Sequence, residues 1–196
     1  MTTPPPTPPP TPPPETNNCD ECGFSDNALS PADVVAALRK FGKRYRAPLT
    51  RFLPGEDGDA LLRQRPAPGV WSALEYAAHV RDVFAWYDER VRRSLTEDQP
   101  SYSGPDPDEA AEAGRYNEQD PATVVAELAA NAEKLAATLE GLPEDAWNRV
   151  HLRRGQPRTV LFSARRAVHE GNHHLLDIGR GLRTVREQWK AGDAAP

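Results

Sequence analysis

Residues 167–178 read AVHEGNHHLLDI and hold three of the five histidines of the chain. Apolar residues recur around them every three or four positions, which predicts a helix. On a helix, His169 and His173 lie one turn apart, roughly 6 Å along the same face. Two imidazoles at this spacing can bind one metal ion, whereas His174 is turned about 100° away. The segment therefore predicts a metal-binding helix.

This helix is the last of four long amphipathic helices that the sequence predicts. It begins after a cap at Thr159 and extends to about residue 190. The other three begin after the N-cap residues Ser30, Ser72 and Asp120, and each carries an apolar stripe. No segment between them is a convincing strand. The expected fold class is all-α, an antiparallel four-helix bundle, either up-down-up-down or with longer crossovers.

The first 29 residues differ in composition from the rest. Residues 1–18 are mostly Thr and Pro, which predicts a disordered tail. Cys19 and Cys22 follow in the sequence CDECG, which is half of a zinc knuckle. Because the chain has no second C-x-x-C, we interpret them as an unpaired thiol pair, with metal binding or redox chemistry as the alternative. The expected division is a tail over residues 1–29 and a helical metal-binding domain over residues 30–192.

The overall composition excludes several classes of function. With a net charge of -5 and 38% hydrophobic residues, the chain has no basic stripe for nucleic acid. No apolar run is long enough for a membrane span, and no signal peptide is visible. Two cysteines are too few for a disulfide scaffold. A cytoplasmic protein is expected, with a small molecule as partner, and a homodimer is compatible with the sequence.

A third histidine completes the predicted metal site. His79 lies among apolar residues in the second turn of the helix that follows Ser72. Facing helices of a bundle build such sites, so His79, His169 and His173 are the predicted ligands. The sequence offers no fourth protein ligand, which leaves a position for water or substrate. Zinc suits three imidazoles best, with nickel and iron as alternatives.

Four carboxylates lie near these histidines in the sequence. They are candidates for orienting an imidazole or for moving a proton, although each could equally be an ordinary exposed helix residue. They are Glu75, Asp82, Glu170 and Asp177.

Two motifs together resemble a known family. They read PGVWSALEYAAHVRD at residues 68–82 and HEGNHHLLDI at residues 169–178. The pair is similar to the DinB/YfiT-like superfamily, in particular to actinobacterial members related to the metal-binding domain of mycothiol-dependent maleylpyruvate isomerase. The resemblance covers roughly residues 30–190.

The resemblance implies a four-helix bundle that holds a divalent metal through His79, His169 and His173. Some relatives place the last-helix histidines differently, so His174 is an alternative third ligand. It further implies a thiol-dependent S-transferase or isomerase that uses a low-molecular-weight thiol of the mycothiol type on a small molecule. A metal with an open position can lower the pKa of such a thiol or of water.

Three other interpretations remain open. The sequence HEGNH also fits the H-E-x-x-H motif of zinc peptidases, with Glu170 as general base and Glu187 as a third ligand. Against this, the extended motif and an edge strand for a peptide are missing. The bundle could also be a non-catalytic, metal-stabilised binding module, or a metal-free bundle that acts through its surface.

Overall fold

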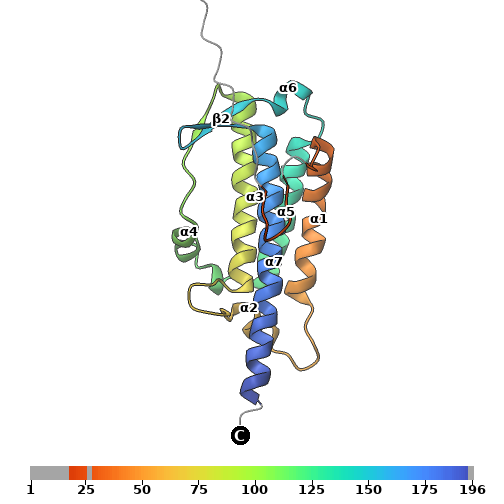
Figure 1. Ribbon diagram of the computed structural model, residues 1–196, viewed down its shortest axis with the longest axis vertical. Helices are drawn as coiled ribbons and strands as arrows, with labels where there is room; N and C mark the ends of the chain where they lie inside the picture. The colour runs from red at the N-terminus through yellow and green to blue at the C-terminus, as the bar shows by residue number, and fades with distance from the viewer. Residues whose placement is uncertain (1–17, 26–27, 194–196) are drawn as a thin grey trace, which may run out of the picture.

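The computed structural model describes residues 18–25 and 28–193. Most of the predicted Thr/Pro-rich tail lies outside the described residues. The long helices lie side by side (Figure 1). They are α1 (Pro31–Thr50), α3 (Ala73–Thr96), α5 (Pro121–Leu139) and α7 (Val160–Asp193).

Each long helix begins where the sequence predicts it. The side chains of Ser30 and Ser72 both accept a backbone N–H three residues on, in capping boxes. Asp120 caps α5 in the same way, and the hydroxyl of Thr159 accepts the N–H of Phe162 at 3.0 Å. These caps satisfy backbone donors that would otherwise have no partner at the start of each helix.

The helices form a square in which α1 and α3 each contact both α5 and α7. Cross-helix contacts give the directions. Arg81 and Asp88 of α3 bond to residues 127 and 138 of α5, so these two helices run parallel. Arg44 of α1 bonds to Asn172 while Arg165 bonds to Leu29 just before α1, so α1 and α7 also run parallel.

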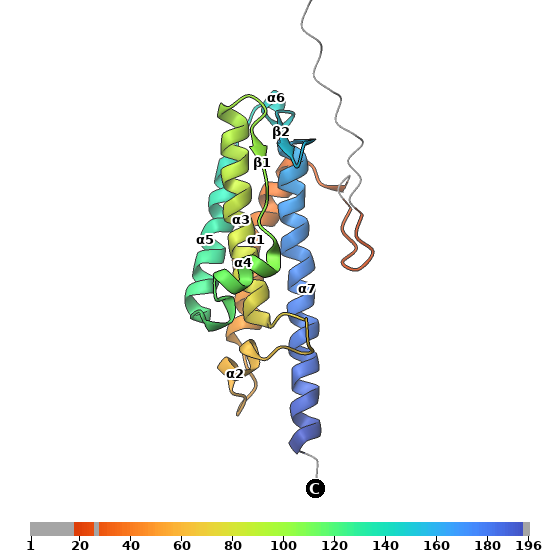
Figure 2. The same cartoon turned by 90° about the vertical axis from the view of Figure 1, so that its left-hand side faces the viewer.

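The antiparallel arrangement that the sequence predicts therefore holds only for two neighbouring pairs, α1 with α5 and α3 with α7. The reason is the connection over residues 97–120, which returns along the length of the bundle before α5 begins (Figure 2). It contains β1 (Ser101–Tyr102), α4 (Pro107–Ala113) and the short 3-10 helix η2 (Tyr116–Glu118). The order of directions is down-up-up-down, with a long crossover.

A small sheet corrects the all-α prediction. Strands β2 (Val150–Arg153) and β3 (Gln156–Thr159) form an antiparallel hairpin, and β1 pairs with β2 in parallel. Arg153 pairs with Gln156, so the loop is Arg154-Gly155, and both of its residues have positive φ. Two-residue hairpin loops of this kind are usually marked by Asn-Gly or Asp-Gly. Because this loop has an arginine in place of Asn or Asp, the sequence does not indicate the turn.

The core lies between the four helices, with short α2 (Gly58–Arg63) and α6 (Glu144–Trp147) at the ends. None of the described helices is long and apolar enough to cross a membrane. Helices α1 and α7 approach closely at Gly171, where a side chain would collide with the ring of Phe41. Large residues with no exposed surface fill the centre, including Leu38, Phe41, Phe84, Leu128, Leu135 and Ile178.

Candidate metal centre

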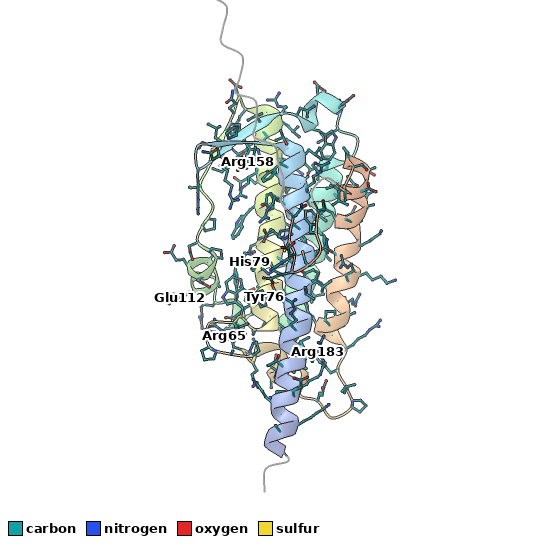
Figure 3. All side chains as sticks on the ribbon, viewed as in Figure 1. Arg65, Tyr76, His79, Glu112, Arg158 and Arg183 are labelled. Atoms are coloured by element: carbon teal, nitrogen blue, oxygen red, sulfur yellow. The ribbon has the colours of Figure 1, made fainter. Side chains whose placement is uncertain are left out.

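One group of metal-binding side chains lies between α3 and α7. One ligand atom each from His79, Glu170 and His174 lies within 4.8 Å of the others. Glu170 and His174 are one turn apart on α7, and His79 comes from the antiparallel neighbour α3. Figure 3 labels His79 and Tyr76 at mid-height of the bundle, beside α7. We call His79, Glu170 and His174 the inner group.

The surroundings of His79 favour an uncharged imidazole that could bind a metal. Its side chain is buried, and its Nδ1 atom has no hydrogen-bond partner among the described residues. Burial, together with the neighbouring charge of His174, lowers the pKa of His79 to about 4. The imidazole is therefore uncharged at neutral pH, with a lone pair available to a metal. The rings of Trp71 and His174 lie 5.2 and 5.0 Å from its ring.

His174 is held in place by two carboxylates. Its Nδ1 lies 3.0 Å from Oδ2 of Asp177, and its Nε2 lies 3.4 Å from Oε2 of Glu170. Although burial disfavours the charged imidazole, these carboxylates raise the pKa of His174 to about 9. Burial likewise opposes ionisation of Glu170, but His169, His174 and Arg166 hold the pKa of its carboxyl well below the usual range.

The inner group fits a divalent metal. A metal ion can take the place of the proton on His174 between that ring and Glu170, while the Nδ1 contact with Asp177 orients the ring. Two imidazoles and one carboxylate, with a position left over, is the ligand set of catalytic zinc sites.

A second group lies on the next face of α7. One atom each from Cys19, Cys22, His169 and His173 lies within 4.8 Å of the others. We call these four residues the outer group. His169 and the backbone N–H of Cys22 lower the pKa of Cys19 to about 6, so its thiolate is populated at neutral pH.

The structure therefore divides the three predicted ligands between two groups. His79 lies in the inner group, while His169 and His173 lie in the outer one. Successive residues of a helix are turned by about 100°, so neighbouring pairs at i and i+4 face different partners. Of these, the Glu170/His174 pair faces α3.

The apolar stripe of α7 indicates which of these pairs faces α3. Glu170 comes three residues after Ala167, and His174 comes four residues before Ile178. Ala167 and Ile178 are completely buried, so Glu170 and His174 lie on the side of α7 next to the core. His169 and His173 lie further round.

The structure favours the metal-binding alternative for the two cysteines. They are not an isolated thiol pair, because α7 brings two histidines to them. These partners do not form a second C-x-x-C, because they are imidazoles far from the cysteines in the sequence.

The four candidate carboxylates have different surroundings. Glu170 belongs to the inner group, and Asp177 bonds to His174. Glu75 accepts hydrogen bonds from Arg65 and completes the cap of α3. Asp82 accepts from Arg81 and from the hydroxyl of Tyr116. These last two carboxylates stabilise local structure.

Comparison with known proteins adds the family. The sequence profile of the DinB superfamily matches residues 56–178. The chain belongs to the DinB superfamily. The match includes His79 and the whole HEGNHHLLDI segment of this DinB protein. No curated protein matches it.

Two solved structures share the DinB fold. YfiT from Bacillus subtilis, described as a probable metal-dependent hydrolase with an unusual four-helix bundle topology, superposes with a TM-score of 0.72 at 18% identity, over 80% of this chain and 90% of that one. A mycothiol-dependent maleylpyruvate isomerase superposes with a TM-score of 0.61 at 18% identity, over 79% of this chain and 62% of that one. At such identities the likeness shows the fold.

Proposed function

We propose that this DinB protein is an enzyme in which His79, Glu170 and His174 hold a divalent metal for thiol-dependent group transfer or isomerisation of a small molecule. The observation that carries the proposal is the inner group itself. It supplies three protein ligands and not four, between two helices, with His79 buried and the other two half-buried. A site that leaves a position open is typical of catalysis, whereas structural sites are closed.

The metal, when bound, would supply Lewis acidity that lowers the pKa of a thiol or water molecule at the site. The chain supplies the rest. His79 provides a neutral nitrogen, Glu170 provides a negative charge, and Asp177 fixes the ring of His174 by accepting at Nδ1. Zinc is the proposed ion, with nickel and iron as alternatives, because nitrogen and oxygen ligands suit all three.

Aromatic side chains give the inner group an apolar wall. The ring of Trp71 lies 5.2 Å from His79, the ring of Tyr76 stacks on His174 at 5.3 Å, and the ring of Trp86 lies 6.3 Å from His79. An apolar wall strengthens electrostatic interactions with a developing charge, because it keeps water away.

Trp86 also borders a hollow of about 280 Å³ between α3 and the crossover connection. Arg90 and Arg93 line the same hollow, together with Ser101 and Tyr102. A small substrate with a carboxylate could bind to the guanidinium groups in this hollow. The ring of Trp86, which borders the hollow, is also a neighbour of His79. We therefore propose a small anionic molecule as substrate.

One of the two solved structures supports the thiol, and the other suggests a variation. One is named as a mycothiol-dependent isomerase, and the other as a probable metal-dependent hydrolase. Hydrolysis would use the same inner group with water in place of the thiol. The peptidase is not proposed, because His169 and His173 are grouped with two cysteines and not with Glu187.

The test combines metal analysis with turnover. Protein loaded with zinc is assayed with mycothiol and maleylpyruvate, and separately with mycothiol and a simple electrophile, for loss of thiol or change of substrate. We expect His79→Gln to abolish turnover and to lower the metal content by one ion per chain. His151→Gln is the matched control, because His151 is also buried but hydrogen-bonds two serines outside the inner group.

Turnover that survives both chelation and His79→Gln would remove the inner group from the reaction. Saturable binding of these compounds without any conversion would show a binding module instead of an enzyme.

A further inference from the structure

The outer group is a complete set of ligands for a tetrahedral metal ion. Cys19 and Cys22 come from the N-terminal segment, and His169 and His173 come from α7. Figure 2 shows this segment on the outer side of α7, away from α3 and α5. At usual zinc bond lengths, a sulfur and a nitrogen ligand lie about 3.5 Å apart. Sγ of Cys19 lies 3.5 Å from Nδ1 of His173.

The N-terminal segment has the backbone of a metal knuckle. The N–H of Cys19 donates to the carbonyl of Phe24 at 2.9 Å, and the N–H of Gly23 donates back to Cys19 at 2.8 Å. Gly23 has a φ of +69°, which closes the turn after Cys22 and is readily adopted by glycine. The turn brings both sulfurs to the side that faces α7.

His169 provides an independent observation. The residue is only 8% exposed, and neither ring nitrogen makes a hydrogen bond among residues 18–25 and 28–193, although Oε1 of Glu170 lies 3.7 Å from Nδ1. Phe24 packs on its ring, with centroids 5.0 Å apart, and covers it from water. A buried imidazole that makes no hydrogen bond is unfavourable, and a metal bond would satisfy one of its nitrogens.

Two carboxylates lie near the Nε2 atom of His173. Its Nε2 lies 3.6 Å from Asp177 and 4.0 Å from Glu21, while Nδ1 faces Cys19. A carboxylate at the far nitrogen is the usual partner of a metal-bound histidine. Glu21 in turn lies 3.4 Å from Arg180.

We propose that Cys19, Cys22, His169 and His173 bind a structural zinc ion that fastens the N-terminal segment to α7. Four protein ligands close the coordination sphere, so this site differs in purpose from the three-ligand inner group. Two thiolates and two neutral imidazoles balance the charge of the ion. The metal-binding domain then includes Cys19 and Cys22, which precede residue 30.

Cobalt(II) tests this proposal, because thiolate ligands give it a sulfur-to-cobalt charge-transfer absorption. The full chain, freed of metal under reducing conditions, is titrated with Co²⁺ alone. We expect the thiolate band to appear, both cysteines to become protected from a thiol reagent, and zinc to displace the cobalt. The band should vanish in Cys22→Ser and His169→Asn.

Two matched variants separate this site from the inner group. Asp20→Ala changes an exposed residue of the same turn and should keep the band. His79→Gln should lose the inner ion and keep the band, whatever its effect on turnover. The proposal is overturned if the wild-type chain gives no thiolate band, if its cysteines stay reactive with metal present, or if Cys22→Ser keeps the absorption. The first two results need no variant, so they hold even if a substitution disturbs folding.

Discussion

Gly171 lies in the segment of α7 that carries the candidate metal ligands, and its replacement by alanine tests how closely this helix packs on α1. A Cβ atom there would lie 2.5 Å from Cζ of Phe41 and 2.8 Å from Cε1 and Cε2. Carbon atoms in contact are normally about 3.5–4.0 Å apart, so the ring or the helix must move by about 1 Å. Phe41 is completely buried and packs against Phe84. Moving the ring of Phe41 or helix α7 therefore costs free energy.

The magnitude follows from two opposing effects. Overpacking a core of this kind costs about 1–3 kcal/mol. Alanine in place of glycine inside a helix gains about 1 kcal/mol. Gly179→Ala isolates the second effect, because Gly179 is an exposed residue of α7 with no atom within 4 Å of its added Cβ. We expect Gly179→Ala to raise the free energy of unfolding by about 1 kcal/mol.

Urea denaturation of the metal-free protein measures both variants. We expect Gly171→Ala to be less stable than Gly179→Ala by about 1–3 kcal/mol, the overpacking cost alone. The hydroxyl of Tyr45 donates to the carbonyl of Gly171 at 2.8 Å, and this buried bond would also be strained if α7 moved. Equal stability of the two variants would refute the close contact between α1 and α7.

Further predictions concern single buried groups. Asp177→Asn, in a Cys22→Ser background that leaves only the inner group, should weaken zinc binding about 10–100-fold by competition titration, since Asp177 orients His174. Burial lowers the pKa of His151 to about 4, below its unfolded value, so the unfolded chain binds the proton more readily and stability falls as the pH drops from 6.5 towards 4. Between pH 7 and 5 the loss is about 2 kcal/mol, and the unfolding free energy of His151→Gln should lack this component. Asp88→Ala should cost about 2 kcal/mol in urea denaturation, because Asp88 is 2% exposed and accepts from Thr138 and Arg92.

The four long helices could be predicted from the sequence because local signals agree with each other. Ser72 shows this clearly, since its capping box with Glu75 forms as the motif indicates. The directions of the helices could not be predicted from such local signals. Whether α5 runs parallel or antiparallel to α3 depends on the path of residues 97–120, and a loop rich in Pro and Gly carries no periodicity that reveals its path.

For the candidate metal ligands, the sequence places His169 and His173 on one helical face but does not show that His174, and not these two, lies beside His79. The i and i+4 spacing of His169 and His173 is real, and the structure places them together. Which partner they face depends on the rotation of α7 about its axis. That rotation is set by contacts such as Gly171 on Phe41, which only the packed bundle shows.

The helix order has a consequence for how the chain reaches this state. No two successive long helices form an antiparallel hairpin, since α1 and α3 lie on a diagonal of the square and α3 runs parallel to α5. The contacts between the long helices thus join distant parts of the chain, and such topologies fold more slowly than simple up-and-down bundles. Helix α7 carries ligands of both metal groups and follows the other three in chain order. During synthesis, neither centre can assemble before this helix has left the ribosome.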